Sequence, residues 1–64
     1  MKGQQFSYRG QVFKIDHIAD HVSDVILGLG WTHFASVSRP KGKKAYYANL
    51  LIADGQIVNS VVVL

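Results

Sequence analysis

A chain of 64 residues has room for one small domain, and we treat residues 1–64 as a single domain. The absence of cysteine excludes disulfides and thiolate metal sites, and it favours a cytoplasmic location. The net charge of +3 permits binding to nucleic acid without requiring it. No apolar run approaches the roughly 20 residues of a membrane span, and the N-terminus lacks the apolar region of a signal peptide, so we expect no membrane association.

The first predicted element is a β-hairpin. The segments Gln4–Tyr8 and Gln11–Ile15 are strand-like and flank the pair Arg9-Gly10. A two-residue loop would place Phe6 opposite Phe13 and Tyr8 opposite Gln11, with the large apolar side chains on one face. Arginine is a poor residue for positive φ, so the turn type stays open.

A helix is predicted over Asp16–Leu29, with Asp16 as its N-cap. Apolar residues recur at three- and four-residue spacing and form one stripe: Ile15, Ile18, Ala19, Val22, Val25, Ile26 and Leu29. Either Gly28 or Gly30 can end the helix in the left-handed conformation. The competing interpretation is a strand at Val25–Leu29, because β-branched residues gather there. We expect Trp31, directly after the helix, to anchor its end against the sheet.

The segment from Trp31 to Leu64 predicts three consecutive antiparallel strands. Asp54-Gly55 lies between Tyr46–Ala53 and Gln56–Val63, and this pair is typical of a two-residue type I′ turn. An unbroken register from that turn places Leu50 opposite Asn59. It assigns Val61 and Val63 to the core face, and Val58 and Val62 to the other face.

The turn Pro40-Lys41-Gly42-Lys43 precedes these two strands. As a four-residue loop it places Val37 opposite Tyr46. Trp31, His33, Ala35 and Val37 then join the core face, where we expect His33 to be a hydrogen-bonded structural residue. Phe34 and Tyr47 fall on the other face.

The element order is therefore ββαβββ, which defines a small single α+β domain. One helix is expected to pack on a mostly antiparallel five-stranded sheet or half-open barrel. Both sheet faces carry large apolar residues, and Val61–Leu64 ends the chain as an apolar strand. An uncovered edge of this kind pairs readily with another strand, so we expect a homodimer or a higher homo-oligomer.

One cluster has the composition of a metal site. On a helix, His17, His21 and Asp24 would lie on one face and offer two imidazoles and a carboxylate to a zinc ion. The alternative is a solvated polar face, which is our expectation: no metal and no cofactor.

Catalytic motifs are also missing from the sequence. There is no Gly-x-Ser-x-Gly nucleophile motif, and the glycines at Gly28 and Gly30 follow the predicted helix instead of preceding it as in a phosphate loop. We therefore expect a protein without enzymatic activity and without catalytic residues.

The candidate binding surface combines aromatic rings with cations. Its predicted nucleic-acid-binding residues are Arg39, Lys41, Lys43, Lys44, Phe34 and Tyr47. Aromatic rings on a sheet, flanked by basic residues, are typical of single-strand binding, because bases stack on the rings while cations follow the phosphates. The alternative is a protein-interaction or inhibitor protein, for example one encoded by a mobile element, that uses the same face or a sheet edge.

No family is recognised from the sequence as a whole. The Pro40–Lys44 turn and the two strands after it resemble part of the small basic SH3-like chromatin proteins of archaea. The chain departs from those proteins because it lacks their lysine-rich strands.

Overall fold

The computed structural model describes residues 2–63 as one sheet with a single short helix. Neighbouring strands are all antiparallel, in the order β1-β2-β3-β4-β5. The elements are β1 (Gln5–Tyr8), β2 (Gln11–Ile18), α1 (Asp24–Gly28), β3 (His33–Ser38), β4 (Ala45–Ala53) and β5 (Gln56–Val63). The predicted order ββαβββ is confirmed, although the helix is far shorter than expected.

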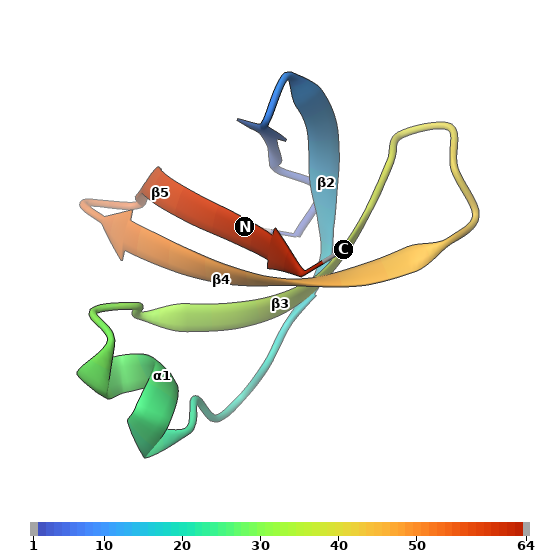
Figure 1. Cartoon of the computed structure of the whole chain (residues 1–64). Helices are drawn as coiled ribbons and strands as arrows, with labels where there is room; N and C mark the ends of the chain where they lie inside the picture. The colour runs from blue at the N-terminus through green and yellow to red at the C-terminus, as the bar shows by residue number, and fades with distance from the viewer. Residues whose placement is uncertain (1, 64) are drawn as a thin grey trace.

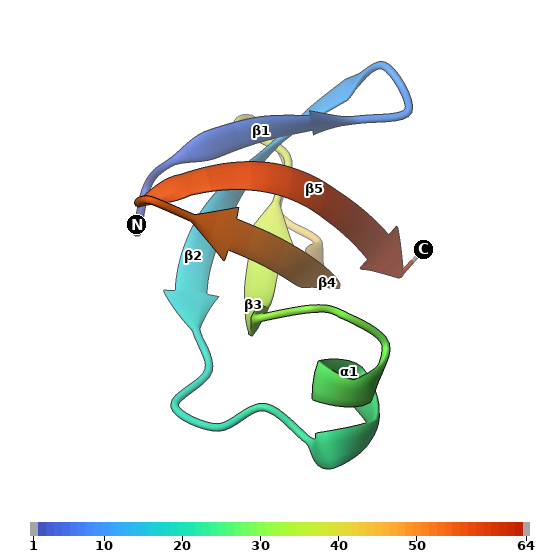
Figure 2. The ribbon, with the colours of Figure 1, turned by 90° about the vertical axis from the view of Figure 1, so that its left-hand side faces the viewer.

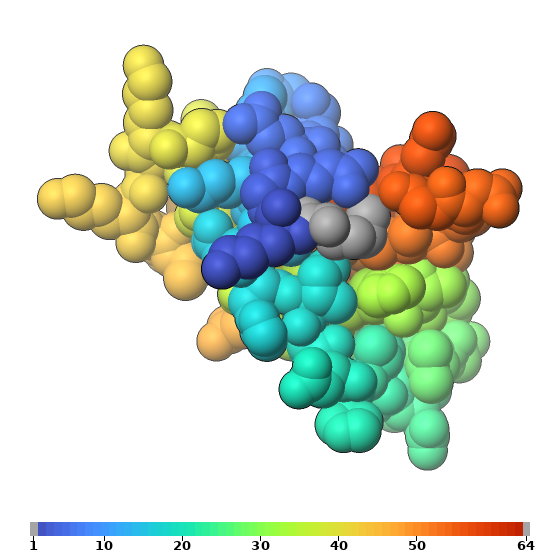
Figure 3. Space-filling view, turned by 180° about the vertical axis from the view of Figure 1, so that it is seen from behind, coloured from blue at the N-terminus to red at the C-terminus, as the bar shows by residue number. Residues whose placement is uncertain are grey.

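The sheet curls into a nearly closed barrel, in which the two edge strands, β1 and β5, lie side by side (Figures 1 and 2). This arrangement corresponds to the predicted half-open barrel. The loop between β3 and β4, drawn in yellow, projects from the body of the molecule (Figure 3). Within the described part of the chain, no helix is long and apolar enough to cross a membrane.

Both two-residue hairpins have left-handed turns. Asp54 and Gly55 have φ values of 53° and 75°, as the predicted type I′ turn requires. Arg9 and Gly10 have φ values of 51° and 77°, so arginine adopts the conformation that the sequence left in doubt. The predicted pairing of Phe6 with Phe13 is confirmed.

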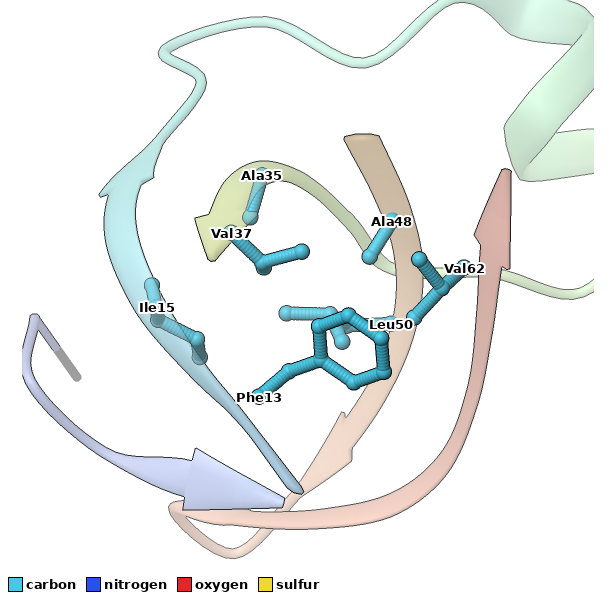
Figure 4. Close-up of a cluster of buried hydrophobic side chains, with 7 residues drawn as sticks. All are labelled: Phe13, Ile15, Ala35, Val37, Ala48, Leu50 and Val62. Atoms are coloured by element: carbon cyan, nitrogen blue, oxygen red, sulfur yellow. The ribbon is translucent and has the colours of Figure 1, made fainter. Parts of the chain in front are cut away.

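The core lies on the concave inner face of the sheet. Figure 4 shows the apolar side chains of β2, β3, β4 and β5 converging there: Phe13, Ile15, Ala35, Val37, Ala48, Leu50 and Val62. The Phe13 ring stacks on Phe6 at 5.9 Å between centroids and meets Tyr46 edge-on at 5.7 Å. These aromatic contacts tie β1 and β4 to β2.

A β-bulge corrects the predicted register of β5. Ile52 pairs with Ile57, but Leu51 then pairs with Asn59, so Val58 is an extra residue. One inserted residue moves every later side chain to the opposite face. Val62 is therefore buried at 3% exposure, while Val63 is 59% exposed. The prediction that Val61 and Val63 face the core, and that Val62 does not, is wrong.

The predicted helix over 16–29 is also wrong. Its first part continues β2, where His17 pairs with Ser36 and Ile18 with Ala35, and Asp16 forms a bulge. Pairing with β3 thus overrides the helical spacing of the apolar residues. The helix that remains has Ser23 as its N-cap, whose hydroxyl accepts a hydrogen bond from the Ile26 N–H at 3.3 Å.

The helix ends as the glycine pattern predicts. Gly30 has a φ of 97°, its N–H donates to Leu27 O, and the Trp31 N–H donates to Ile26 O. These two bonds form a Schellman motif with Gly30 in the left-handed position. Trp31 itself is half-buried.

No side chain of α1 is buried. Val25 and Leu29 are 73% and 71% exposed, and Leu27 is also exposed. The expected packing of the helix on a sheet face is therefore wrong. The helix lies beside one end of the barrel, carried by the connection between β2 and β3 (Figures 1 and 2).

Removing the apolar side chains of α1 should leave the free energy of unfolding nearly unchanged. We expect the variant Val25→Ser with Leu29→Ser to lose no more than about 0.5 kcal/mol per substitution, as for other surface positions. Leu50→Ala, at a fully buried position, should cost about 2–5 kcal/mol. Urea denaturation measures both. A loss of several kcal/mol in the α1 variant would show that the helix packs in solution.

Thr32 fixes the end of the β2–β3 connection to β4. Its hydroxyl accepts a hydrogen bond from the Ile52 N–H at 2.8 Å and donates one to Leu50 O at 3.2 Å. His33 Nδ1 lies 2.8 Å from the same hydroxyl oxygen. The Thr32 hydroxyl thus links the His33 ring to the backbone of β4. His33 is thus a hydrogen-bonded structural residue, as predicted.

Candidate nucleic-acid interface

Positive charge gathers at one end of the barrel. In an up-and-down sheet the β1–β2 turn and the β3–β4 loop emerge at the same end, and Arg39 Nη1 donates to Gln11 Oε1 across them at 3.0 Å. This basic end carries five of the seven cations: Arg9, Arg39, Lys41, Lys43 and Lys44. The opposite end carries Asp20, Asp24 and Asp54, in the β2–β3 connection, α1 and the β4–β5 turn. The charge is therefore separated along the strand direction.

Arg9 is the member of the basic end that the sequence analysis missed. It lies 30 residues before Arg39 in the chain and belongs to a different hairpin. The signal that could have found it is the strand order. A meander of antiparallel strands necessarily brings the first and third turns to one end.

The β3–β4 loop is folded back tightly on itself. The Gly42 N–H donates to Arg39 O at 2.9 Å, which closes a β-turn with Pro40 at its second position. A Cβ at position 42 would lie 3.0 Å from the Arg39 Cβ, so a larger residue would displace the arginine. This turn presents Lys41 at its third position and Lys43 directly after it, both exposed.

Three of the cations lie over aromatic rings. The Arg39 guanidinium is 5.9 Å from the centre of the Phe13 ring, and Lys44 Nζ is 5.1 Å from the centre of the Tyr46 ring. Arg9 lies 5.4 Å from the ring of Tyr8. Each ring belongs to the inner face, so these cations cover the end of the barrel core. Such contacts hold a cation in place without neutralising its charge.

The predicted aromatic pair is also formed. Phe34 of β3 and Tyr47 of β4 stack with their centroids 5.6 Å apart and their planes 11° from parallel. They lie on the outer face of the sheet. Tyr47 is 56% exposed and Phe34 is half-buried, so one side of the tyrosine ring rests on phenylalanine. The exposed ring is thereby held in a fixed orientation.

A buried polar atom lies beside this aromatic pair. Asn49 is the direct cross-strand partner of Phe34. Its side-chain oxygen is buried, and among residues 2–63 it has no hydrogen-bond partner. A buried acceptor without a donor costs about 1–3 kcal/mol. The outer face thus contains one group that packing alone does not explain.

The two parts of the predicted surface lie on different faces. Arg39 and Lys44 turn toward the inner face at the basic end, whereas Phe34 and Tyr47 lie on the outer face. Lys44 and Tyr47 are three residues apart, or about 10 Å along an extended strand. A ligand that touches both must therefore pass from the barrel end onto the outer face of β3 and β4.

The helical arrangement behind the zinc hypothesis does not form. His17 lies in β2, His21 in the connection after it, and only Asp24 in α1. Among the residues described, no three His, Cys, Asp or Glu side chains are grouped as metal ligands.

The chain matches no protein-family model, no curated protein and no solved structure. A functional assignment must therefore come from the charge separation and from the aromatic pair.

Proposed function

We propose that the protein is a small non-enzymatic module that binds nucleic acid with its basic end and the Phe34–Tyr47 pair. The observation that carries this proposal is the concentration of five cations at one end of the barrel. Like charges at such short separations repel one another, and this repulsion opposes what the contacts with rings and with Gln11 contribute to the isolated fold. A polyanion offsets that repulsion and releases its own counterions when it binds.

The roles of the residues follow from their positions. Arg9, Arg39 and Lys44 are held over rings and would contact phosphates at the barrel end. Lys41 and Lys43 extend the same positive field from the projecting loop (Figure 3). The exposed side of the Tyr47 ring would take a base, because stacking needs a flat surface and tolerates any sequence. A single strand, with unpaired bases, suits this combination better than a duplex.

A salt-dependent gel shift tests the proposal. The purified protein, treated with nuclease and freed of the enzyme, is mixed with labelled single- and double-stranded DNA and RNA at about 50 mM salt. We expect binding that weakens steeply between about 50 and 200 mM salt, with single strands preferred. Failure to bind any of the four oligonucleotides at the lower salt concentration would overturn the proposal.

Removing the Tyr47 ring should weaken binding without changing its salt dependence. Base stacking on an aromatic side chain is worth about 1–3 kcal/mol, so Tyr47→Ala should lower affinity roughly 5- to 150-fold. The ring makes no charge contact, so the slope of log affinity against log salt should stay constant. Tyr47→Phe, which keeps the ring, is the matched control. Equal binding by the wild type and Tyr47→Ala would exclude the outer face from the site.

Binding to another protein is the second candidate function, and α1 is the observation that favours it. Its exposed side chains Val25 and Leu27, with Leu29 as its C-cap, lie at the acidic end, away from the basic loop. Exposed apolar clusters of this kind mark interaction surfaces. Affinity purification with the wild type and with Val25→Ser plus Leu29→Ser compares this candidate directly. A partner retained equally by both proteins would show that α1 is not the contact.

A further inference from the structure

The free edge of β5 is long, uncharged and only partly accompanied by another strand. β5 ends the sheet order, and its sequence from Gln56 to Val63 contains no charged residue and no proline. A groove of about 510 Å³ separates β1 from β5 and is lined on the β5 side by Ile57–Ser60. The two strands diverge toward the C-terminal end of β5 (Figure 2). Within residues 2–63, no strand therefore pairs with the outer edge of Val61–Val63.

The orientation of the β5 backbone follows from its neighbour. Leu50 O accepts a hydrogen bond from the Thr32 N–H at 2.9 Å, on the side of β4 that faces β3. Leu50 thus turns its backbone away from β5, and its partner Ser60 turns its own N–H and C=O toward the open edge. By the same alternation, Val62 also points its backbone groups outward.

The two outward-pointing residues differ in one respect. The Ser60 N–H donates to the side-chain oxygen of Asn59 at 2.9 Å, so this donor already has a partner. Val62 lies two residues further along the same edge, beyond the reach of that amide. An unpaired edge N–H and C=O of this kind is a template for another strand.

We infer that the Val61–Val63 edge pairs antiparallel with the same edge of a second copy, about a two-fold axis at Val62. The occupant is a second copy because identical uncharged strands bring no like charges together and exchange both Val62 hydrogen bonds symmetrically. On the outer face, the exposed Val63 of one copy would pack against Val61 of the other. Tyr47, the cross-strand partner of Val63, flanks this cluster.

The short β1 edge does not compete for this role. β1 has four residues, one end of its open edge is closed off by β5, and Arg9 follows it directly. A short edge bordered by a charge is a poor template for pairing. The self-pairing of β5 does not depend on nucleic-acid binding, because it uses none of the cations and Tyr47 only borders the valine cluster.

Sedimentation of nuclease-treated protein tests the inference. The wild-type mass should rise from 7.1 kDa toward twice that value as concentration increases from micromolar to millimolar. Because no charges meet, the association should be unchanged between about 50 and 500 mM salt. Val63→Lys should stay monomeric, since it places one lysine on each side of the axis, opposite Val61 of the other copy. A wild type that remains at the monomer mass throughout this range would overturn the inference.

Two further variants locate the contact. Val58→Lys introduces the same charge on the same strand at almost the same exposure, 57% against 59%, but outside the pairing segment. It should dimerise like the wild type, and loss of the dimer in both lysine variants would contradict pairing at Val61–Val63. Asn59→Ala frees the Ser60 N–H and should strengthen dimerisation; weaker association in this variant would equally contradict the inference. The gel shift is read on the wild-type protein and sedimentation on nuclease-treated protein, so the two proposals fail separately.

Discussion

Replacing Phe13 with alanine should remove most of the stability of the molecule. The ring is 1% exposed and contacts Phe6 and Tyr46, so its loss leaves a cavity that β1 and β4 both border. Large-to-small changes of this kind cost about 3–5 kcal/mol. A domain of this size has a thin margin, because it buries only about 60% of the surface of its unfolded chain. Most of the Phe13→Ala protein should therefore be unfolded or close to it at 25 °C.

Urea denaturation followed by tyrosine and tryptophan fluorescence measures this loss. Val12→Ala, at the neighbouring and exposed position, is the matched control and should change stability by no more than about 0.5 kcal/mol. A loss below about 1 kcal/mol in Phe13→Ala would mean that the barrel core is not packed around this ring.

The same substitution connects the core to the basic end. Arg39 lies over the Phe13 ring and donates to Gln11, so the ring helps to hold the Arg39 guanidinium in place. Stability and nucleic-acid affinity should therefore fall together in Phe13→Ala. Phe13→Leu keeps most of the side-chain volume but no ring. It should therefore lose less stability than Phe13→Ala, while still losing the ring contact that positions Arg39.

The parts of the fold that the sequence predicted correctly depend on short-range chemistry. Asp54-Gly55 requires positive φ at both positions, and it set the pairing of Ala53 with Gln56 and of Ile52 with Ile57. The loop after Arg39 set the pairing of Val37 with Tyr46 in the same way. Each register holds as far as the strand stays regular.

The errors begin where contacts distant in the sequence decide the outcome. Nothing local to Val58 indicates a bulge, because valine fits a regular strand equally well. Its effect appears only in Val62, which enters the core in place of Val61 and Val63. In the same way, Ile15 and Ile18 have helical spacing, but an extra residue at Asp16 lets both side chains face the core of a bulged strand.

The candidate site also has one part that local sequence predicts and one part that depends on distant contacts. The shared face of Phe34 and Tyr47 could be predicted, because the length of the β3–β4 loop sets the register between their strands. The direction of Arg39 and Lys44 could not, since it depends on the rings of Phe13 and Tyr46 at the end of the barrel. Neighbours in a basic run therefore have different surroundings: some cations are held over rings, while Lys41 and Lys43 extend from the turn.

Removing those two lysines should have the largest effect on the salt dependence of binding. Lys41 and Lys43 are exposed on a loop that projects from the barrel, so Lys41→Ala with Lys43→Ala should leave the fold intact. Each phosphate contact contributes about 0.7–0.9 to the slope of log affinity against log salt, so two lost contacts should lower it by about 1.4–1.8. Affinity should fall for every oligonucleotide sequence, because phosphate contacts carry no sequence information.

Fluorescence anisotropy titrations at several salt concentrations measure that slope directly. Lys2→Ala is the control, since it removes one exposed cation from a residue outside the basic end. It should leave the slope unchanged, whereas a ligand attracted only by net charge would respond to any lost lysine. If Lys2→Ala lowers the slope as much per residue as the loop variant does, the attraction comes from the total charge of the protein. The basic end would then not be the phosphate site, and Arg9, Arg39 and Lys44 would be cations that cap the barrel core.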